Sequence, residues 1–332
     1  MTEAVRIGLI GCGTISPAYL RAAETFKILN FVACADINPD ASAATNSRFG
    51  IPNVTVDQLL ANDEIEVVLN LTIPAVHAEI NESALESGKH AYCEKPFGLQ
   101  VDEGRTVLEL AQSKGLRVGC APDTFLGGGH QTVRKLVDEG AIGEPVAATA
   151  FMMSHGVETW HPSPIFYYKR GGGPVFDMAP YYLTALVNCL GPIARVSAIT
   201  GRAFDERTIT SQPLAGEVIE VEVATHASSS LEFESGAIAT VCMSFDVWAH
   251  RHPNIELHGT KSSMVVPDPN GFGGKVLLPE PGRGWKEQEL THGYTGNMRS
   301  IGLADMCMGI RTDRPHRANG DLAFHVLEVM AA

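Results

Sequence analysis

The stretch Val5-Arg-Ile-Gly-Leu-Ile-Gly-Cys-Gly-Thr-Ile-Ser16 joins a short apolar run to a glycine-rich turn and then to a helical pattern. Residues 5–10 predict a buried strand, and residues 17–26 predict the helix that follows. Gly11 permits a tight turn, and Gly13 lets the backbone approach a pyrophosphate, which the free amides at the helix start then face. The stretch therefore predicts the first strand-turn-helix unit of a dinucleotide-binding fold, with Ser16 where the third glycine of the motif usually stands.

The same alternation of strands and helices continues through the first ~120 residues. Further strands are predicted at residues 31–35, 66–72, 91–93 and 117–120, and helices between them at residues 39–49, 76–87 and 101–114. Short apolar runs without polar alternation are typical of strands that crossover helices bury on both faces of a parallel sheet. This half predicts a doubly wound Rossmann domain.

The second half has a different pattern. Strands are predicted at residues 144–153, 194–204, 218–228, 231–233, 237–246, 254–258 and 264–266, helices at 296–310 and 320–330, and a Pro- and Gly-rich loop at 267–284. Polar and apolar residues alternate in Val221-Glu-Val-Ala-Thr-His-Ala227, which favours an antiparallel sheet with one solvated or partner-facing side. A boundary near Ala121-Pro122 gives domains 1–121 and 122–332, and an alternative has the C-terminal helices packing back on the first domain.

Size and charge limit the function classes. A chain of 332 residues is longer than one core usually supports, so two domains are expected. A net charge of −13 disfavours nucleic acid and anionic membranes as partners. No apolar run approaches the ~18 residues of a membrane helix, and the run at residues 5–10 is too short for a signal-peptide core.

The cysteines and histidines predict neither disulfides nor a metal site. The 7 cysteines are widely scattered and form no CxxC, which is typical of buried thiols in a reducing compartment. The 12 histidines show no metal-ligand spacing. We therefore expect a cytoplasmic protein without a metal.

Asp36 strengthens the dinucleotide prediction. It ends the second predicted strand, 23 positions after Gly13, where a carboxylate accepts hydrogen bonds from the adenosine ribose. Ile37 and Asn38 follow, with no Arg for a 2′-phosphate, which favours NAD(H) over NADP(H). The alternatives are an ordinary strand-to-helix turn for the glycines and a helix-capping role for Asp36.

Two further segments lie at the same predicted edge of the sheet. Thr72-Ile-Pro74 follows the strand at residues 66–72 and should border the cofactor. Glu94-Lys95-Pro96 follows the next strand, and a lysine there can hydrogen-bond a substrate hydroxyl or carbonyl. The alternative for Lys95 is a solvated loop lysine.

These motifs together resemble the Gfo/Idh/MocA oxidoreductase family, named after glucose-fructose oxidoreductase and inositol dehydrogenase. The resemblance covers essentially the whole chain and rests on the glycine motif, Asp36, Thr72–Pro74 with His77, Glu94–Pro96, and Gly171-Gly-Gly173 before Asp177. It implies a Rossmann domain and a C-terminal α/β domain with a large, mostly antiparallel open sheet that often mediates dimer or tetramer contacts. It also implies NAD(P)-linked oxidation or reduction of a sugar, cyclitol or related polyol, with Lys95 in the active site.

One motif departs from the family. The usual pattern Asp-x-Gly-x-His-x-x-Asp is here Asp177-Met-Ala-Pro-Tyr-Tyr-Leu-Thr184, so Tyr181 stands in place of the histidine acid/base. Asp177 and Tyr181 share a helix face, because they are four residues apart. Pro180 suits a helix only if it begins near Met178, which would make Asp177 an N-cap with a purely structural role.

We expect Tyr181 to take over the role of the missing histidine. A neighbouring Lys95 ammonium would favour the phenolate and bring the tyrosine pKa down from ~10 toward working pH. Tyr181 would then exchange the hydroxyl proton during hydride transfer. The alternative is a tyrosine packed under the sheet.

The expected site has three groups of residues. The catalytic residues are Lys95, Tyr181 and Asp177. The cofactor-binding residues are Gly11, Gly13, Thr14, Ile15, Asp36, Thr72, Pro74, His77, Glu94 and Lys95. The substrate-binding residues are Lys95, Asp123, His155, Trp160, His161, Asp177 and Tyr181.

The leading functional hypothesis is an NAD(H)-dependent oxidoreductase acting on a secondary hydroxyl or ketone of a sugar, glycoside or cyclitol. One alternative is a glycoside hydrolase or lyase of the same fold that retains its NAD, and another is a non-enzymatic NAD(H) sensor. The sequence lacks GxxxxGK[ST], HExxH and GxSxG, so kinase-like, zinc-protease and serine-hydrolase functions have no support. The expected partners are a small polyol or sugar and further copies of the chain, as a homodimer or homotetramer through the C-terminal sheet.

Overall fold

The computed structural model describes residues 3–332, which form two compact units. The first unit contains the chain up to Leu126 together with Gly296–Ala331, and the second contains Gly127–Thr295. The C-terminal helices thus belong to the same unit as the glycine-rich turn.

The first unit is built on a five-stranded parallel sheet with the order β2-β1-β3-β4-β5. Its strands are β1 (Val5–Ile10), β2 (Leu29–Ala35), β3 (Val67–Asn70), β4 (His90–Cys93) and β5 (Val118–Cys120). Nearly all side chains of β1, β3, β4 and β5 are buried, as expected for strands covered by helices on both faces, whereas the edge strand β2 is fully buried only over its last three residues. The predicted doubly wound domain is confirmed.

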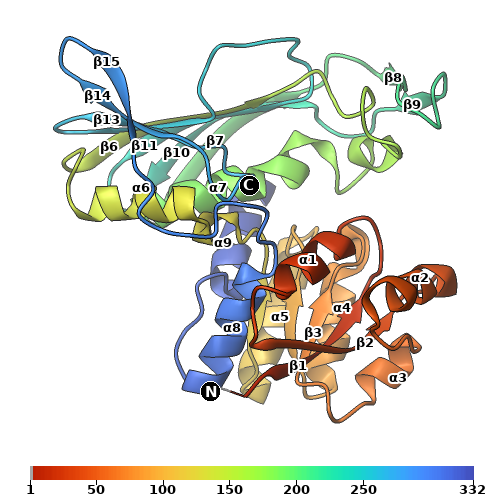
Figure 1. The fold of residues 1–332 in the computed structure, drawn as a ribbon. Coiled ribbons are helices and arrows are strands. Elements are labelled where there is room, and N and C mark those ends of the chain that lie inside the picture. Colours follow the sequence, from red (N-terminus) through yellow and green to blue (C-terminus); the bar gives the residue numbers. More distant parts are fainter. Residues whose placement is uncertain (1–2) are drawn as a thin grey trace. The chain divides into compact units, whose positions relative to one another are not determined.

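The helices of this unit are joined to the strands by short loops (Figure 1). They are α1 (Ser16–Ala23), α2 (Pro39–Phe49), α3 (Val56–Leu60), α4 (His77–Glu86) and α5 (Val101–Lys114), with the 3-10 turns η1 (Pro74–Val76) and η2 (Thr124–Leu126), and from the C-terminal segment α8 (Ile301–Thr312) and α9 (Gly320–Ala331). Helix α5 ends where Gly115 adopts a left-handed conformation, the usual helix stop. Within the unit α8 packs against α1 and α9 packs against α5.

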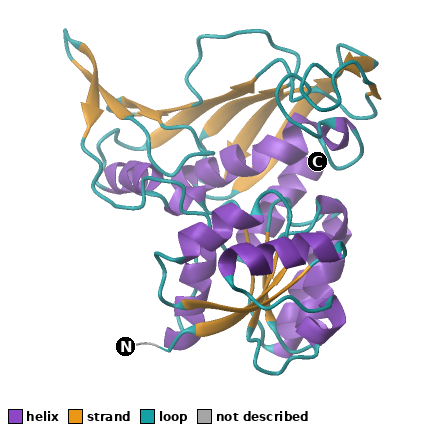
Figure 2. Ribbon diagram, turned by 45° about the vertical axis from the view of Figure 1, so that its right-hand side comes forward, coloured by secondary structure: helices purple, strands orange, loops and turns teal. Residues whose placement is uncertain are grey.

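The second unit is built on an eight-stranded, mostly antiparallel sheet with the order β15-β14-β13-β12-β6-β11-β10-β7, in which only β6 and β11 pair in parallel among the described strands. The strands are β6 (Pro145–Met153), β7 (Ile193–Gly201), β10 (His226–Phe233), β11 (Ile238–Ser244), β12 (Ile255–Gly259), β13 (Ser263–Val266), β14 (Val276–Glu280) and β15 (Gly284–Gln288). Helices α6 (Gly128–Asp138) and α7 (Gly173–Leu190) cover one face of the sheet (Figure 2). The predicted large, mostly antiparallel sheet is confirmed.

Two sequence expectations in this unit are wrong. The predicted strand 218–228 is divided into β9 (Val218–Glu220), which pairs with β8 (Glu206–Thr208), and the start of β10, which continues without a break through Ser229 and Ser230. The predicted loop 267–284 contains β14, which pairs with β15 in a short hairpin. Pro279 lies in this hairpin, although prolines are uncommon within sheets. Alternation alone cannot tell which partner strand each residue pairs with.

No helix within residues 3–332 is both long enough and apolar enough to span a bilayer.

Candidate active site

The glycine-rich turn follows β1 and contains two glycines with different roles. Gly11 has φ +97°, and a Cβ there would lie 2.5 Å from the backbone carbonyl of Leu71. Gly13 has no atom within 4 Å of the position its Cβ would take. The fold itself therefore requires a glycine at Gly11, whereas Gly13 leaves open space at the turn that a pyrophosphate could enter.

Helix α1 begins at this turn without a side-chain cap among the described residues. Its N-cap is Ile15, and Pro17 occupies the first turn, where a proline costs no hydrogen bond. The buried Ser16 donates its hydroxyl to the Gly13 carbonyl at 2.9 Å, so the residue in the third-glycine position supports the turn. An uncapped helix N-terminus favours an anion, which is the chemistry of a dinucleotide pyrophosphate.

Asp36 lies at the carboxyl end of β2 and contacts the same turn. Its Oδ2 accepts a hydrogen bond from the Cys12 amide at 2.7 Å, and its Oδ1 accepts one from the Asn38 amide at 2.8 Å. The N-cap of α2 is Asn38, so Asp36 is not the capping residue of that helix. Because each carboxylate oxygen has two lone pairs, Asp36 can still accept from a ribose diol.

The sequence interpretation missed two apolar side chains at this edge. Ile37 is 97% exposed and Ile73 is 66% exposed, and they follow β2 and β3. Exposed isoleucines beside a polar turn are suitable walls for a flat, weakly polar ring. The only sequence signal was their position directly after Asp36 and Thr72.

Asn70, at the end of β3, binds both Thr72 in the loop that follows and His77 at the start of α4. Its Oδ1 accepts from the Thr72 hydroxyl at 2.6 Å and from the Thr72 amide at 3.2 Å, and its Nδ2 donates to the His77 carbonyl at 3.0 Å. Asn70 is fully buried, so these bonds fix the Thr72–Pro74 loop at the carboxyl edge.

His77 joins that loop to the lysine loop. Its Nδ1 lies 2.7 Å from the Pro96 carbonyl oxygen, and its Nε2 lies 3.1 Å from the Thr72 carbonyl oxygen. Burial lowers the pKa of His77, which favours the neutral ring. The structure thus gives His77, expected to contact the cofactor, two partners within the protein.

Glu94 and Lys95 follow β4 at the same edge of the sheet. Glu94 accepts a hydrogen bond from the buried Tyr19 phenol at 2.7 Å and another from the Lys95 amide at 3.0 Å. The Glu94 amide donates to the Asn70 carbonyl at 2.9 Å. The carboxyl edge therefore brings together the glycine turn and the Asp36, Thr72 and Lys95 segments, as the sequence predicted.

Asp123 follows β5 and is fully buried. Its Oδ2 accepts from the amides of Ser300 at 3.1 Å and Gly302 at 3.0 Å, at the start of α8. Burial raises the pKa of Asp123 to about 6, and these two bonds only partly offset that effect. The carboxylate expected to bind substrate thus interacts with a helix N-terminus in its own unit.

In the second unit, helix α7 carries Asp177 and Tyr181. The helix begins at Gly173, with Gly172 as its N-cap, so the expectation of a start near Met178 with Asp177 as the cap is wrong. Pro180 lies inside the helix, where it has no N–H to donate to the Phe176 carbonyl. Asp177 and Tyr181 lie on one helical face, as their spacing predicts.

The neighbouring Tyr182 has other partners. Its phenol accepts a hydrogen bond from the Asn254 side chain at 2.7 Å and lies 3.5 Å from the Phe151 carbonyl. Tyr182 therefore ties α7 to the sheet.

The aromatic residues of the loop after β6 form two separate groups. His155 stacks on Trp248 with ring centroids 3.3 Å apart and an angle of 15° between the rings. Trp160 packs edge-on against His161, with centroids 5.4 Å apart, and is 65% exposed. Trp248 is not among the expected site residues, and nothing in the chain order links residues 155 and 248.

A buried charge network holds the same loop and was also missed. Arg207 is buried and pairs with Glu158 at 3.0 Å and with Asp246. Glu158 also accepts from the buried Tyr168 phenol. The residues of this charge network come from three distant segments of the chain, so no local sequence motif predicts it.

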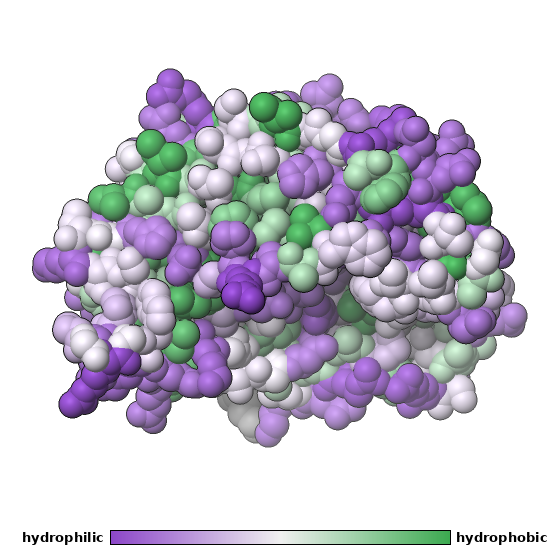
Figure 3. Space-filling model, turned by 90° about the horizontal axis from the view of Figure 1, so that it is seen from above, coloured by the Kyte–Doolittle hydropathy of each residue, from purple (hydrophilic) through white to green (hydrophobic). Residues whose placement is uncertain are grey.

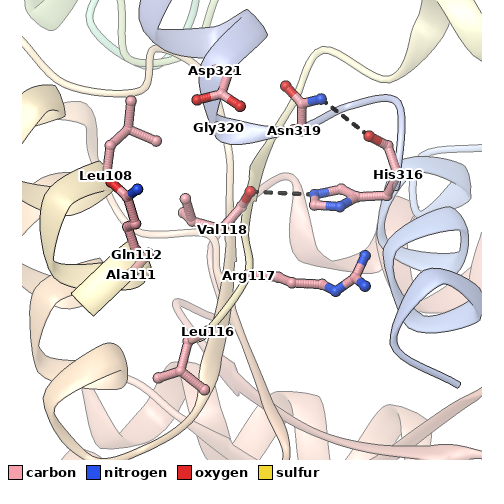
Figure 4. Close-up of a pocket in the computed structure, with 10 residues that line it drawn as sticks. All are labelled: Leu108, Ala111, Gln112, Leu116, Arg117, Val118, His316, Asn319, Gly320 and Asp321. Carbon is pink, nitrogen blue, oxygen red and sulfur yellow. Dashed lines mark hydrogen bonds between the residues drawn. The ribbon is translucent and has the colours of Figure 1, made fainter. Parts of the chain in front are cut away.

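One pocket of about 380 Å³ lies in the first unit, beside the start of β5 (Figure 4). Two of its polar side chains bind within the protein, since Arg117 donates to the Arg314 carbonyl at 2.5 Å and His316 Nε2 lies 3.2 Å from the Val118 carbonyl. The pocket adjoins the amino end of a parallel strand, whereas ligands of such sheets bind at the carboxyl ends. Within residues 3–332 no cluster of three or more His, Cys, Asp or Glu side chains is arranged to hold a metal ion.

Comparison with curated proteins finds relatives across most of the chain. Inositol 2-dehydrogenase of Rhizobium meliloti is 27% identical over 264 residues, covering 79% of this chain and 75% of that protein. Levoglucosan dehydrogenase of Pseudarthrobacter phenanthrenivorans is 25% identical over 286 residues, covering 79% and 73%.

Solved structures share the fold. A levoglucosan dehydrogenase in complex with NADH and L-sorbose superposes with a TM-score of 0.84 at 21% identity, covering 99% of this chain and 95% of the other. Residues 5–121 match the oxidoreductase family with the NAD-binding Rossmann fold, and residues 130–265 match the GFO/IDH/MocA C-terminal domain. Since these two matches follow one another along the chain, the protein belongs to the GFO/IDH/MocA family of oxidoreductases and carries its NAD-binding Rossmann domain.

Proposed function

We propose that the protein is an NAD(H)-dependent oxidoreductase that transfers a hydride between the nicotinamide and a secondary hydroxyl or ketone of a sugar, glycoside or cyclitol. The observation that carries the proposal is the position of the Lys95 loop. This loop follows β4 at the same edge of the sheet as the glycine turn and Asp36. Relatives that act on inositol and levoglucosan support this substrate class.

The cofactor would be held by groups of the first unit. The open space at Gly13 and the N-terminus of α1 suit the pyrophosphate, and Asp36 suits the adenosine ribose. Ile37 and Ile73 would flank the adenine. Thr14, Ile15, Thr72, Pro74, His77 and Glu94 complete the proposed cofactor site.

We infer NAD rather than NADP as the preferred cofactor. The Asp36 carboxylate would repel a 2′-phosphate, and the following residues, Ile37 and Asn38, provide no cation to bind one. A ratio of kcat/KM for NAD over NADP well above one is expected, and a preference for NADP would contradict this inference.

Bound nicotinamide supplies the acceptor or donor of the hydride. Lys95 would hydrogen-bond the reacting oxygen, and Tyr181 would exchange its proton, with the lysine charge favouring the phenolate. Asp177 would bind or orient a neighbouring hydroxyl of the substrate. Asp123, His155, Trp160 and His161 are the further proposed substrate contacts.

The experiment is a panel of sugars, glycosides and cyclitols tested for formation of NADH by absorbance. We expect net NADH with at least one polyol, and much less with Tyr181→Phe, which keeps the ring and removes the proton donor. Sugar turnover without net NADH would instead indicate a retained cofactor, and binding of NAD without any turnover would indicate a sensor.

We also propose a homodimer or homotetramer formed through the helix-free face of the second unit. Neighbouring strands there present small or weakly polar side chains, among them Ser228, Ser230 and Thr240, together with the exposed Ile199 and Ile238. Figure 3 looks onto this side, where green and pale side chains are interspersed with purple ones. Light scattering of Ile199→Asp against the wild type tests the proposal, since the variant should dissociate.

The seven cysteines are free, which supports the inference of a reducing, cytoplasmic setting.

A further inference from the structure

Glu94 is bound at both carboxylate oxygens by neutral donors of its own unit. Its Oε1 accepts from the Tyr19 phenol at 2.7 Å, and its Oε2 accepts from the Lys95 amide at 3.0 Å. The side chain therefore bridges helix α1 to the backbone of the loop that follows β4. Tyr19 and Glu94 are 75 positions apart in the sequence, so only the folded chain makes this link.

Tyr19 is itself fixed. The residue is fully buried in α1, and its carbonyl accepts from the Ser300 hydroxyl at 3.0 Å. Burial, together with the negative charge of Glu94, raises the pKa of Tyr19 well above its ordinary value. The phenol consequently keeps its proton and remains a donor to Glu94 at any working pH.

The backbone of the same loop is held at other points. The Glu94 amide donates to the Asn70 carbonyl at 2.9 Å, and the Pro96 carbonyl faces His77 at 2.7 Å. Residue 95 lies between these two contacts, and its own amide donates to the Glu94 carboxylate. The Tyr19 bond therefore decides whether the Glu94 carboxylate stays aimed at that amide.

We propose that Tyr19 is a positioning residue for Lys95: its buried phenol fixes the Glu94 carboxylate, which fixes the backbone from which the Lys95 side chain extends. The inference rests on the proposed function, in which Lys95 contacts the reacting oxygen. Misplacement of a reacting group by about 1 Å lowers rates by as much as ~100-fold, so a loosened loop reduces turnover without removing a catalytic atom.

The test compares Tyr19→Phe with Tyr92→Phe. Both tyrosines are fully buried in the first unit, but the Tyr92 hydroxyl has no hydrogen-bond partner within residues 3–332. We expect Tyr19→Phe to lower kcat by ~10- to 100-fold with KM for NAD little changed, while Tyr92→Phe keeps the wild-type kcat. A merely structural role of the buried ring would make the two variants alike.

A second readout does not depend on activity. Amide hydrogen exchange of the peptide spanning residues 94–99, followed by mass spectrometry, should speed up in Tyr19→Phe and stay unchanged in Tyr92→Phe. If the wild type turns over no polyol, the proposed function fails, and this exchange difference still decides whether Tyr19 fixes the loop.

Glu94→Gln provides an internal check. A glutamine offers one carbonyl oxygen, so it can accept from Tyr19 or from the Lys95 amide but not from both in the observed arrangement. We expect Glu94→Gln to lower kcat as Tyr19→Phe does, and the double variant to lose no more than either single one. Wild-type kcat and unchanged exchange in Tyr19→Phe, or fully additive losses in the double variant, would overturn the proposal.

Discussion

Glu94 in the first unit and Glu158 in the second each accept a hydrogen bond from a buried tyrosine, Tyr19 and Tyr168 respectively, but their second oxygens differ. Glu94 meets a backbone amide at 3.0 Å, whereas Glu158 meets the Arg207 guanidinium at 3.0 Å. The first arrangement orients a loop by neutral donors. In the second arrangement, the buried charges of Glu158 and Arg207 neutralise each other.

The difference predicts opposite responses to mutation. Neutral donors around Glu94 hold a loop at a sheet edge, so changes there should affect catalysis more than folding. Arg207 shares its charge between Glu158 and Asp246 inside the protein, so its loss leaves uncompensated buried carboxylates. Activity and stability measured on the same variants therefore separate the two regions.

The largest effect is expected for Lys95→Met, which keeps most of the side-chain length and removes the ammonium. Loss of a group that assists proton transfer lowers kcat by about 10²- to 10⁴-fold. The melting temperature should change little. Lys114→Met, at an exposed position on α5, is the control and should behave as the wild type. An active Lys95→Met enzyme would remove the lysine from the mechanism.

Arg207→Met should be the most destabilising change in the second unit. Removing one partner of a buried ion pair costs about 3–5 kcal/mol in the free energy of unfolding. The control is Arg195→Met, because Arg195 forms an ion pair with Glu232 while its side chain is 76% exposed, and such pairs contribute about 0–1 kcal/mol. Urea denaturation of both variants measures the contrast. Equal losses would show that the burial of the Arg207 network is not what stabilises it.

Asp123 extends the comparison to a carboxylate that is fully buried. Its pKa is raised from 3.8 to about 6, so the folded protein holds this proton more tightly than the unfolded chain. The resulting stability is present below pH ~4 and is lost as the pH rises through about 6. Relative to the wild type, the free energy of unfolding of Asp123→Asn should therefore rise by up to ~3 kcal/mol between pH 4 and 7.

Denaturant titrations at several pH values test this prediction. The difference in unfolding free energy between Asp123→Asn and the wild type should grow with pH. A difference that stays constant from pH 4 to 7 would mean that the carboxyl has its ordinary pKa in the folded protein.

The smallest effect on stability is expected at Gly13 in the glycine turn, in contrast to Gly11. Gly11→Ala places a Cβ against the Leu71 backbone at φ +97°, and left-handed backbone alone costs about 1–2 kcal/mol in stability. Gly13→Ala meets no neighbouring atom, so it should fold normally and weaken only the binding of NAD. Thermal melts and cofactor titrations measure the two effects. If Gly13→Ala bound NAD as the wild type does, the open space there would not be the pyrophosphate site.

The sequence predicted well which segments meet at the carboxyl edge of the parallel sheet, because each of these segments is recognisable locally. A strand end followed by Gly11 and Gly13, by Asp36 or by Lys95 is recognisable within a few residues. Parallel strands then bring their carboxyl ends to one edge, so several separate motifs predict a single site.

The sequence could not predict which groups hold that edge in place. Tyr19 is an apolar-face position of α1, which is indistinguishable from an ordinary core residue until its phenol is seen 2.7 Å from Glu94. His155 and Trp248 are 93 positions apart and stack only because β6 and β11 are neighbours in the sheet. The start of α7 was also missed, because Pro180 suggested a later beginning than Gly173.

By itself the sequence determined the fold class, the dinucleotide turn and the lysine loop, since glycine geometry, apolar runs and strand ends depend on neighbouring residues. Only the tertiary structure decided that Glu94 is held by Tyr19, that Asp123 binds the start of α8, and that Arg207 joins Glu158 to Asp246. Hydrogen bonds and ion pairs act over about 3 Å between groups that can be 50 or more residues apart. Such pairs become defined only when the chain has folded.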